Sequence, residues 1–508
     1  MVAGRVVQSA SMQRLPCKHI LFVLCVTALS ACEQPAPPDA PTPPPVPRDV
    51  QPADKSSVEE TVESDVTGDA SPVEPVTDEE PATAESFRPP DLRLRQNADN
   101  LKPLGIHEHA SRRLILYADI DPETAAVLPP VIDQAFETWE EYFGPLPPAR
   151  DGSDYQLTGF IMRDQSPFRT AGLLPVHLPP FAHGKHDAQQ FWMNDADSDY
   201  YRRHLMIHEA THCFMQSMGG TTRDVPVWYL EGMAEHFATH AIHDDGTINF
   251  GVMPDVREHF VGFGRIPMIR REVEEGRLLS VDQVRQLQPD DFVQHNESYA
   301  WAWALCHWID SHPRYQQPFR QLGREYVADG FDHTFTELFT ENLSGLDAEW
   351  RLFVRHLCYG FDISAAAFDL QDANAGLTSD VPRVTVVANR GWQPSMWTVR
   401  KGASYNVSAN GRTILAHSPK PWESEPQGIS IRYNEGRPIG RLIGDVISTP
   451  DPQTGRRHVS ETIDLGRDGD FTAPIDGTLY LRVNDCWNEL SDNTGQYTVS
   501  LRANVDSK

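Results

Sequence analysis

One pentapeptide, His208-Glu209-Ala210-Thr211-His212, constrains this 508-residue chain more than any other stretch. Residues four apart share one face of a helix, so His208 and His212 can direct two imidazole nitrogens at one metal ion. Glu209 lies about a third of a turn from that face, where a carboxylate can contact a metal-bound water without binding the metal. The pattern predicts a helix carrying half of a zinc site. A chance match is the alternative, so a third ligand is needed.

A third ligand follows at a suitable spacing. Eighteen residues separate His212 from Glu231, which lies in a second predicted helix opened by Pro226. Gly219-Gly220 breaks the chain between the two helices, so a hairpin can bring Glu231 against the histidines. Two His and one Glu around Zn²⁺ leave the fourth position open for water. Glu235, one turn beyond Glu231, can accept the outer N–H of a liganding histidine.

These residues resemble the gluzincin metallopeptidases, specifically the family typified by membrane alanyl aminopeptidases and its "MA-like" relatives. The shared features are H-E-x-x-H, an 18-residue spacer and an E-G-x-A-E helix, here Glu231-Gly232-Met233-Ala234-Glu235. The resemblance implies an α+β zincin-like metallopeptidase domain with a mostly helical C-terminal lobe. It also implies that Glu209 is the general base in peptide-bond hydrolysis.

The same family has a tyrosine that donates its hydroxyl to the oxyanion. Tyr299, 68 residues after Glu231, is the candidate, although an aromatic residue on an Ala/Trp-rich helix can equally be part of the core. His204 precedes His208 by one turn. We expect His204 to be a surface histidine, with a contact to a zinc ligand or to substrate as the alternative.

Three strands are predicted before the zinc helix, over residues 111–117, 155–162 and 189–193, with a helix over 121–143. In the resembled family the last strand is an exposed edge to which an extended peptide adds; an ordinary edge is the alternative. Its aminopeptidases hold the free amine of the substrate with the acid of a G-x-M-E-N strand. Phe191–Asp195, taken as the comparable stretch, has no matching glutamate, which favours an endopeptidase.

The beginning of the chain has the pattern of an exported bacterial lipoprotein. Basic residues precede a short apolar run over 20–26, which is followed by Leu29-Ser30-Ala31-Cys32. The last four residues resemble a lipobox, which implies that 1–31 are a signal peptide and that Cys32 is acylated. A transmembrane anchor is the alternative, but the apolar run is too short to span a bilayer. The protein is therefore expected on the periplasmic or outer surface of a bacterial membrane, held to the lipid bilayer through Cys32.

Residues 32–90 are predicted to be a disordered tether. From Glu33 to Pro90 there are 14 prolines and 14 acidic residues against three basic ones. Such a segment cannot bury enough apolar surface to order itself. The whole chain has a formal net charge of −28, which argues against nucleic acid as a partner. The remaining length is enough for two domains, a metallopeptidase domain at 91–372 and a second one at 381–508.

In residues 381–508 the hydrophobic pattern changes to a period of two, in short runs separated by Gly, Pro and Asn. This pattern predicts an all-β sandwich. The stretch resembles the calcium-dependent galactophilic lectins of bacteria, most clearly at Asn484-Asp485, Asp492-Asn493-Thr494-Gly495, Gln427-Gly428 and Leu442-Ile443-Gly444.

The lectin resemblance nominates a calcium site and a sugar contact. The calcium ligands implied are the side chains of Asp485, Asp492 and Asn493 with the carbonyls of Glu489 and Leu415. An acidic turn without an ion is the alternative. Gln427 corresponds to a sugar-contacting glutamine of the lectins. Ser424 stands where the lectins have histidine, so galactose specificity does not follow.

Together these features predict a lipid-anchored zinc-dependent peptidase, an endopeptidase, with a C-terminal carbohydrate- or surface-binding module. Its expected partners are a peptide or protein substrate and glycans or glycoproteins. The alternative is a non-catalytic envelope adhesin whose zincin-like domain is structural. Glu209 beside intact ligands favours the enzyme, because an inactive domain has no use for a base there.

Overall fold

The computed structural model describes residues 87–176, 178–218, 225–324, 330–339, 343–372 and 383–504. The predicted signal peptide, Cys32, most of the tether and Gly219-Gly220 lie outside the described residues. All described residues fall within the compact unit Pro81–Lys508. Among them, no helix combines the length and apolar character needed to cross a membrane.

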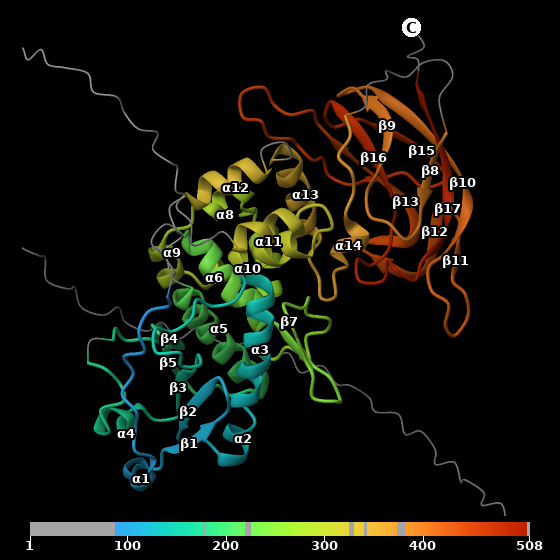
Figure 1. The fold of residues 1–508 in the computed structure, drawn as a ribbon. Coiled ribbons are helices and arrows are strands. Elements are labelled where there is room, and N and C mark those ends of the chain that lie inside the picture. Colours follow the sequence, from blue (N-terminus) through green and yellow to red (C-terminus); the bar gives the residue numbers. More distant parts are fainter. Residues whose placement is uncertain are drawn as a thin grey trace, which may run out of the picture. The chain divides into compact units, whose positions relative to one another are not determined.

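The first part of the described chain is built on a five-stranded sheet with the order β1-β2-β3-β5-β4 (Figure 1). Its strands are β1 (His107–Ala110), β2 (Leu114–Ala118), β3 (Leu157–Met162), β4 (Gly184–Asp187) and β5 (Gln190–Asn194). The central strands β2, β3 and β5 are parallel, and β1 and β4 pair antiparallel at the two edges. Both faces of β3 are buried, as expected for a central parallel strand. The three strands predicted from the sequence are confirmed as β2, β3 and β5.

The expectation that the last predicted strand is an exposed edge is wrong. β5 is an inner strand, because β4 pairs along its outer side. β4 has the sequence Gly-Lys-His-Asp and shows no apolar alternation, so periodicity could not reveal it. The chain turns back into β5 at Ala188, whose φ is 49°. Phe191–Asp195 therefore lies on an inner strand, and β4 forms this edge of the sheet.

Two helices pack on the sheet face that carries the larger core. The predicted helix over 121–143 is divided at Pro129-Pro130 into α2 (Pro122–Ala126) and α3 (Pro129–Phe143). The zinc helix α5 (Asp199–Ser217) begins at Ser198, whose hydroxyl accepts the N–H of Tyr201 at 3.0 Å. The opposite face of the sheet is covered by a smaller core that includes Phe160, Trp192 and Phe168 of α4 (Gln165–Thr170).

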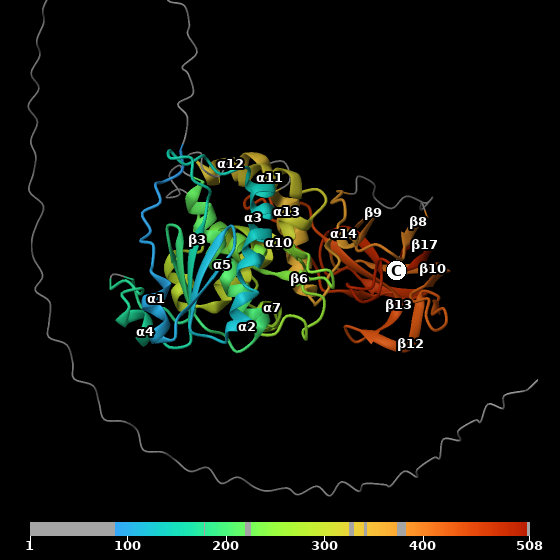
Figure 2. The ribbon, with the colours of Figure 1, turned by 60° about the horizontal axis from the view of Figure 1, so that its bottom comes forward.

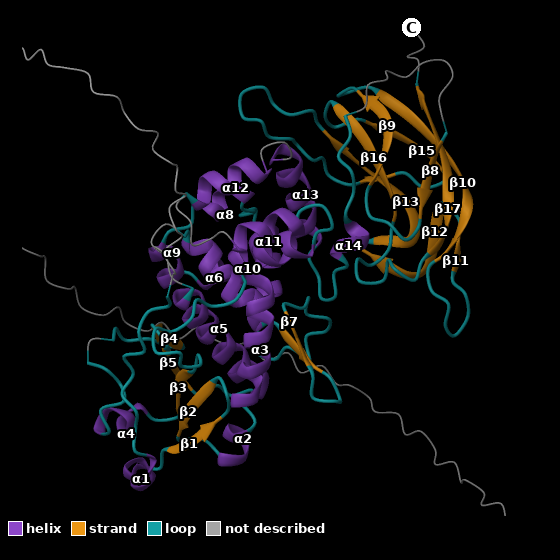
Figure 3. Cartoon of the chain, viewed as in Figure 1, coloured by secondary structure: helices purple, strands orange, loops and turns teal. Residues whose placement is uncertain are grey.

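A helical region follows α5, as the sequence predicted (Figures 2 and 3). Its members are α6 (Val227–Ala238), α7 (Arg265–Glu274), α8 (Val281–Arg285), α9 (Pro289–Gln294), α10 (Asn296–Ser311), α11 (Gln316–Arg324), α12 (Phe331–Phe339), α13 (Leu343–His356) and α14 (Ile363–Ala366). Short elements complete this part: α1 (Ala98–Leu101), a 3-10 turn (Lys102–Leu104), β6 (His240–Ile242) and β7 (Ile248–Phe250). α6 contacts both α5 and α10.

The C-terminal region is all-β, as its period of two predicted. One sheet has the order β11-β10-β17-β8 with β15 also on β10, and the other has the order β12-β13-β16-β9 with β14 also on β13. The strands are β8 (Val384–Val387), β9 (Gln393–Val399), β10 (Ser404–Ile414), β11 (Glu423–Ser424), β12 (Gln427–Asn434), β13 (Arg437–Ile447), β14 (Ile463–Asp464), β15 (Asp468–Thr472), β16 (Gly477–Val483) and β17 (Thr494–Ala503). Their inner residues form one core, as in a sandwich.

The helical and β regions also share buried aromatic residues. Trp487 stacks on Phe361 with ring centroids 5.1 Å apart, and Tyr480 meets Phe368 at 5.4 Å. Both aromatic residues of the β region belong to the core that fills the helical region. The sequence leaves cysteine pairing open; Cys213, Cys306, Cys358 and Cys486 are free thiols in the structure.

Candidate metal centre

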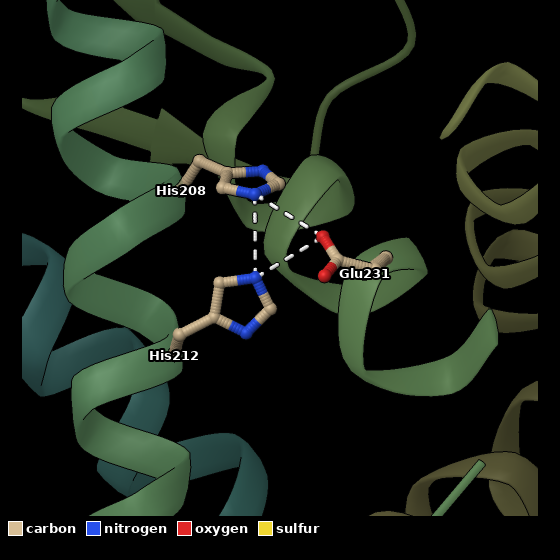
Figure 4. A group of neighbouring side chains, drawn as sticks. All are labelled: His208, His212 and Glu231. Carbon is tan, nitrogen blue, oxygen red and sulfur yellow. Dashed lines mark hydrogen bonds and ion pairs between the residues drawn. The ribbon is translucent and has the colours of Figure 1, made fainter. Parts of the chain in front are cut away.

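The structure brings His208, His212 and Glu231 together. α5 presents the two histidines one turn apart, and α6 directs the carboxylate of Glu231 at both (Figure 4). The two Nε2 atoms are 3.3 Å apart, and Oε2 of Glu231 lies 3.4 Å from His208 Nε2 and 3.2 Å from His212 Nε2. Three donor atoms therefore face a common point.

This triangle of donor atoms fits a zinc ion. A tetrahedral ion bound at about 2.0–2.1 Å holds its ligand atoms roughly 3.3 Å apart, which matches the three distances above. Two imidazole nitrogens cannot hydrogen-bond each other unless one carries a proton, whereas a cation satisfies all three atoms at once. Both histidines are only 5 % exposed. The two histidines are thus shielded from bulk water, whereas the side chain of Glu231 is 18 % exposed.

The charges within the triangle favour a cation as well. Burial raises the pKa of Glu231, but His212 and His208 outweigh burial and hold that pKa well below its usual range. Burial lowers the pKa of His212 to about 4. Burial also opposes protonation of His208, but Glu231 and Glu235 raise its pKa to about 10. A bound metal would displace the proton of His208.

Glu235 supports the ligands from the next turn of α6. Its Oε1 lies 3.4 Å from Nδ1 of His208, as the sequence predicted, and its Oε2 lies 3.3 Å from Nε2 of His204. Arg265, the first residue of α7, donates two hydrogen bonds to the same carboxylate at 2.7 and 3.0 Å. Burial raises the pKa of Glu235, but Arg265 and His204 outweigh it and keep the group ionised.

The expectation that His204 is a surface residue is wrong. Its side chain is 1 % exposed, and Nδ1 donates to the carbonyl oxygen of Ala238 at 3.0 Å. That carbonyl belongs to the last residue of α6, so the pairing depends on the packing of two helices. Arg265 was missed because it comes 30 residues after Glu235 without a motif. Sequence spacing carries no signal for either contact.

Glu209 points toward β4. Its Oε2 lies 3.0 Å from Nδ1 of His186, and the ring of His186 stacks on that of His212 with centroids 4.2 Å apart. Burial raises the pKa of Glu209, but His186 outweighs burial and lowers it. The carboxylate of Glu209 is therefore ionised and able to accept a proton. Sequence analysis missed His186 because it missed β4.

Tyr299 stands in the first turn of α10, beside the ligands. Its ring centroid is 6.3 Å from that of His208, and the guanidinium of Arg265 lies 5.5 Å from its ring. Burial raises the pKa of the phenol, and Glu231 adds to this effect. The hydroxyl therefore stays protonated at neutral pH and is available as a donor.

In the C-terminal region Asp485, Glu489 and Asn493 lie together. Asn493 Nδ2 donates to Asp485 Oδ2 at 3.0 Å, and the guanidinium of Arg432 contacts the carboxylates of Asp485 and Glu489. Arg432 already supplies one positive charge there.

The remaining nominated residues differ in exposure: Asp492 and Gln427 are exposed and Leu415 is buried. The side chain of Asp492 is exposed, and its carbonyl accepts from Nε2 of His417 at 3.0 Å. Leu415 is buried, and its N–H donates to the carbonyl of Trp422. Gln427 is exposed and donates to Glu425 at 3.4 Å.

Comparison with known proteins gives distant similarities. A family described as "Protein of unknown function (DUF1570)" matches residues 204–321, a span that holds His208, His212, Glu231 and Tyr299. No curated protein matches.

Solved structures similar to the chain include the catalytic module of the metalloprotease ZmpA from Clostridium perfringens. That match has 11 % identity and a TM-score of 0.30, covering 79 % of this chain and 72 % of that one. The chain is also similar to CBM32 and M60 catalytic domains of ZmpB from the same organism. Here the identity is 10 % and the TM-score 0.28, over 73 % of this chain and 40 % of that one. A PllA-like lectin, the EclA N-terminal domain, matches at 18 % identity and a TM-score of 0.20, over 25 % of this chain and all of that one.

Proposed function

We propose that this protein is a zinc-dependent peptidase. The observation that carries the proposal is the convergence of His208, His212 and Glu231 on one point, with the ionised carboxylate of Glu209 on the same helix. Zn²⁺ held by these three residues would supply a Lewis acid that polarises the attacking water and the peptide carbonyl.

The side chains of the protein perform the remaining steps. Glu209 accepts a proton from the attacking water and passes it to the nitrogen of the leaving amine. Tyr299 donates a hydrogen bond to the carbonyl oxygen as that oxygen gains negative charge. The carboxylate of Glu235 lies beside Nδ1 of His208, which favours the tautomer with the hydrogen on Nδ1 and leaves the Nε2 lone pair for the metal.

We expect the protein to cleave internal peptide bonds, because the residues of the edge strand β4 offer no group to hold the free amine of a substrate. Gly184 and His186 pair with Met193 and Phe191, so they share the sheet face that packs on α5. Successive side chains of a strand alternate, which puts Asp187 on the other face, together with Trp192. No carboxylate of β4 therefore stands beside the metal ligands to hold a free amine.

The first test is metal analysis of the recombinant protein beside its His212→Ala variant. We expect one zinc per wild-type molecule and a large loss in the variant, because one of three ligands is gone. Equal zinc content in both proteins would rule out the site.

The second test is an unbiased peptide-library digest that compares the wild type with Glu209→Gln. The variant should retain zinc and lose hydrolysis. Release of single N-terminal residues without internal cleavage would identify an aminopeptidase.

We also propose that the protein is exported and held to a bacterial membrane through a lipid on Cys32. The support is the Leu29-Ser30-Ala31-Cys32 sequence and the proline-rich acidic segment after it. Cys32→Ser should move the protein from the membrane fraction to the soluble fraction of expressing cells, and mass spectrometry of the wild type should detect the acyl chains. An unmodified Cys32 in the membrane fraction would contradict lipidation.

A further inference from the structure

Resting on the proposed function, we propose that two residues of β4, Gly184 and His186, form a clamp that positions the carboxylate of Glu209. We call this pair the Glu209 clamp. His186 acts through Glu209 and is a positioning residue.

The clamp begins with the register of β4. Gly184 and His186 are separated by one residue, so their α-carbons present the same face of the strand. Their partners on β5, Met193 and Phe191, belong to the core beneath α5. The strand face formed by Gly184 and His186 therefore faces α5, the helix that carries Glu209. Lys185 pairs with Trp192 and looks the other way.

His186 holds one oxygen of the base. Its Nδ1 is 3.0 Å from Oε2 of Glu209, a distance at which an Nδ1–H donates to a carboxylate oxygen. The imidazole cannot turn freely, because its ring stacks on His212 at an interplanar angle of 21°. The side chains of His186 and Glu209 are 18 % and 7 % exposed, so water competes little for this bond.

Gly184 leaves room for the other oxygen. A Cβ atom at residue 184 would lie 2.3 Å from Oε1 of Glu209 and 2.8 Å from its Cδ. The φ of Gly184 is not in the left-handed region, so an alanine there would meet no strain except this contact. The carboxylate is thus enclosed between a strand backbone and an imidazole.

This enclosure has a consequence for catalysis. A carboxylate on two rotatable methylenes can occupy several rotamers, only some of which face the attacking water. Holding Oε2 against His186 and seating Oε1 against Gly184 restricts the carboxylate to one orientation. Loss of such positioning costs on the order of 100-fold in rate when the reacting atoms shift by about 1 Å.

The experiment compares His186→Ala, His186→Asn and the control His333→Ala, a histidine whose side chain is 77 % exposed on α12. Zinc content, kcat and KM are measured on a peptide found in the library digest. We expect His186→Ala to keep its zinc and its KM within a few-fold and to lose about 10- to 100-fold in kcat. His186→Asn should recover most of that loss, because its amide nitrogen can donate from the position of Nδ1. His333→Ala should match the wild type.

Each other outcome would overturn the clamp. Unchanged kcat in His186→Ala, with Glu209→Gln inactive, would refute the clamp and leave the peptidase proposal standing. Loss of zinc in His186→Ala would make His186 a ligand. Failure of His186→Asn to recover activity would refute the donor role.

A second measurement does not depend on activity. Gly184→Ala should lower the melting temperature of the wild type, because Glu209 must move, and should have little effect in a Glu209→Ala background, where the obstructing oxygen is gone. If the wild type cleaves no peptide, the peptidase proposal fails and this pair of variants still decides the clamp. An equal effect of Gly184→Ala in both backgrounds would refute it.

Discussion

At the scale of single residues, the interior of this protein contains charged groups in two different situations. Glu235 is 2 % exposed but accepts two hydrogen bonds from Arg265 and lies beside two histidines. Asp445 of β13 is fully buried, and neither of its oxygens has a partner with normal hydrogen-bond geometry. The contacts of Glu235 stabilise its ionised form, whereas burial without a partner destabilises the ionised form of Asp445.

Asp445 therefore predicts a specific dependence of stability on pH. Burial raises its pKa to about 7, although Thr462 and Arg355 act in the opposite direction. Between the ordinary carboxyl pKa and pH 7 the folded state keeps a proton that the unfolded state loses, so Asp445 lowers the free energy of unfolding as pH rises through this window. Asp445→Asn, which is always neutral, should raise stability at pH 8 by on the order of a few kcal/mol. The difference should vanish near pH 4.

The measurement is chemical denaturation of both proteins at pH 4, 6 and 8. Because the two proteins are compared at the same pH, titration elsewhere in the chain cancels from the difference. An equal difference at all three pH values would contradict a titrating Asp445.

The candidate site shows which contacts residue spacing can predict. His208 and His212 follow from helix geometry alone, and Glu231 follows because two helices and a short connection leave few ways to pair. His186 and Arg265 contact Glu209 and Glu235 through tertiary packing. A histidine in a four-residue strand and an arginine that begins a helix have no local pattern that distinguishes them from surface residues.

At the scale of elements, the site depends on how closely α6 and α10 approach. Gly232 of α6 follows Glu231, and a Cβ atom there would lie 2.5 Å from Sγ of Cys306 and 2.7 Å from the backbone oxygen of Ala302. Both atoms belong to α10, which also carries Tyr299. The small residue at this position lets one helix bring a metal ligand beside the candidate oxyanion donor on the other.

We expect Gly232→Ala to destabilise the protein by about 1–3 kcal/mol, because a backbone atom cannot yield as a side chain can. It should also weaken zinc binding, since Glu231 moves with the helix. Gly345 of α13 is the matched control, because a Cβ there would meet only Leu370 at 3.5 Å. Gly345→Ala should be neutral or should stabilise by up to about 1 kcal/mol through helix propensity. Thermal melting and zinc titration of both variants provide the check; equal effects would mean that the helix crossing tolerates a methyl group.

Helices and strands could be predicted where the hydrophobic residues of a single segment repeat with a regular period. A period of two predicted the strands of the C-terminal region, and the family resemblance implied a mostly helical lobe after the hairpin. β4 was not predicted, because its two inward-facing residues are Gly184 and His186 and not apolar side chains, so its four residues show no apolar repeat. Missing β4 had the largest effect on the predicted site, because β4 and not Phe191–Asp195 forms this edge of the sheet.

At the scale of the whole molecule, the helical and β regions share a core. Trp487 contacts Phe361 and lies against the guanidinium of Arg482 at 3.4 Å, and Asp362 N–H donates to the carbonyl of Trp487. An isolated β region would expose Trp487 to water. A test for calcium binding in the β region therefore uses the whole chain.

The last prediction concerns the cation that neutralises Asp485 and Glu489. Two cations are candidates for this role. Arg432 contacts both carboxylates, and calcium is implied by the lectin resemblance. The buried Oδ1 of Asn493 has no hydrogen-bond partner, which favours a further cation. A ligand bound only by the folded state raises the melting temperature by mass action. We expect the zinc-loaded protein to melt several degrees higher in millimolar calcium than without it, and Asp485→Asn to abolish the difference.

Calcium is added in this experiment and no chelator is used, so zinc is not removed from the protein. A change in melting temperature then reports on the cluster of Asp485 and Glu489. Magnesium at the same concentration is the control, because it demands near-octahedral geometry and gives up its water reluctantly. Identical melting curves with and without calcium would assign the neutralising role to Arg432. In that case Arg432→Ala should be strongly destabilising, since it would leave two carboxylates together, one of them fully buried.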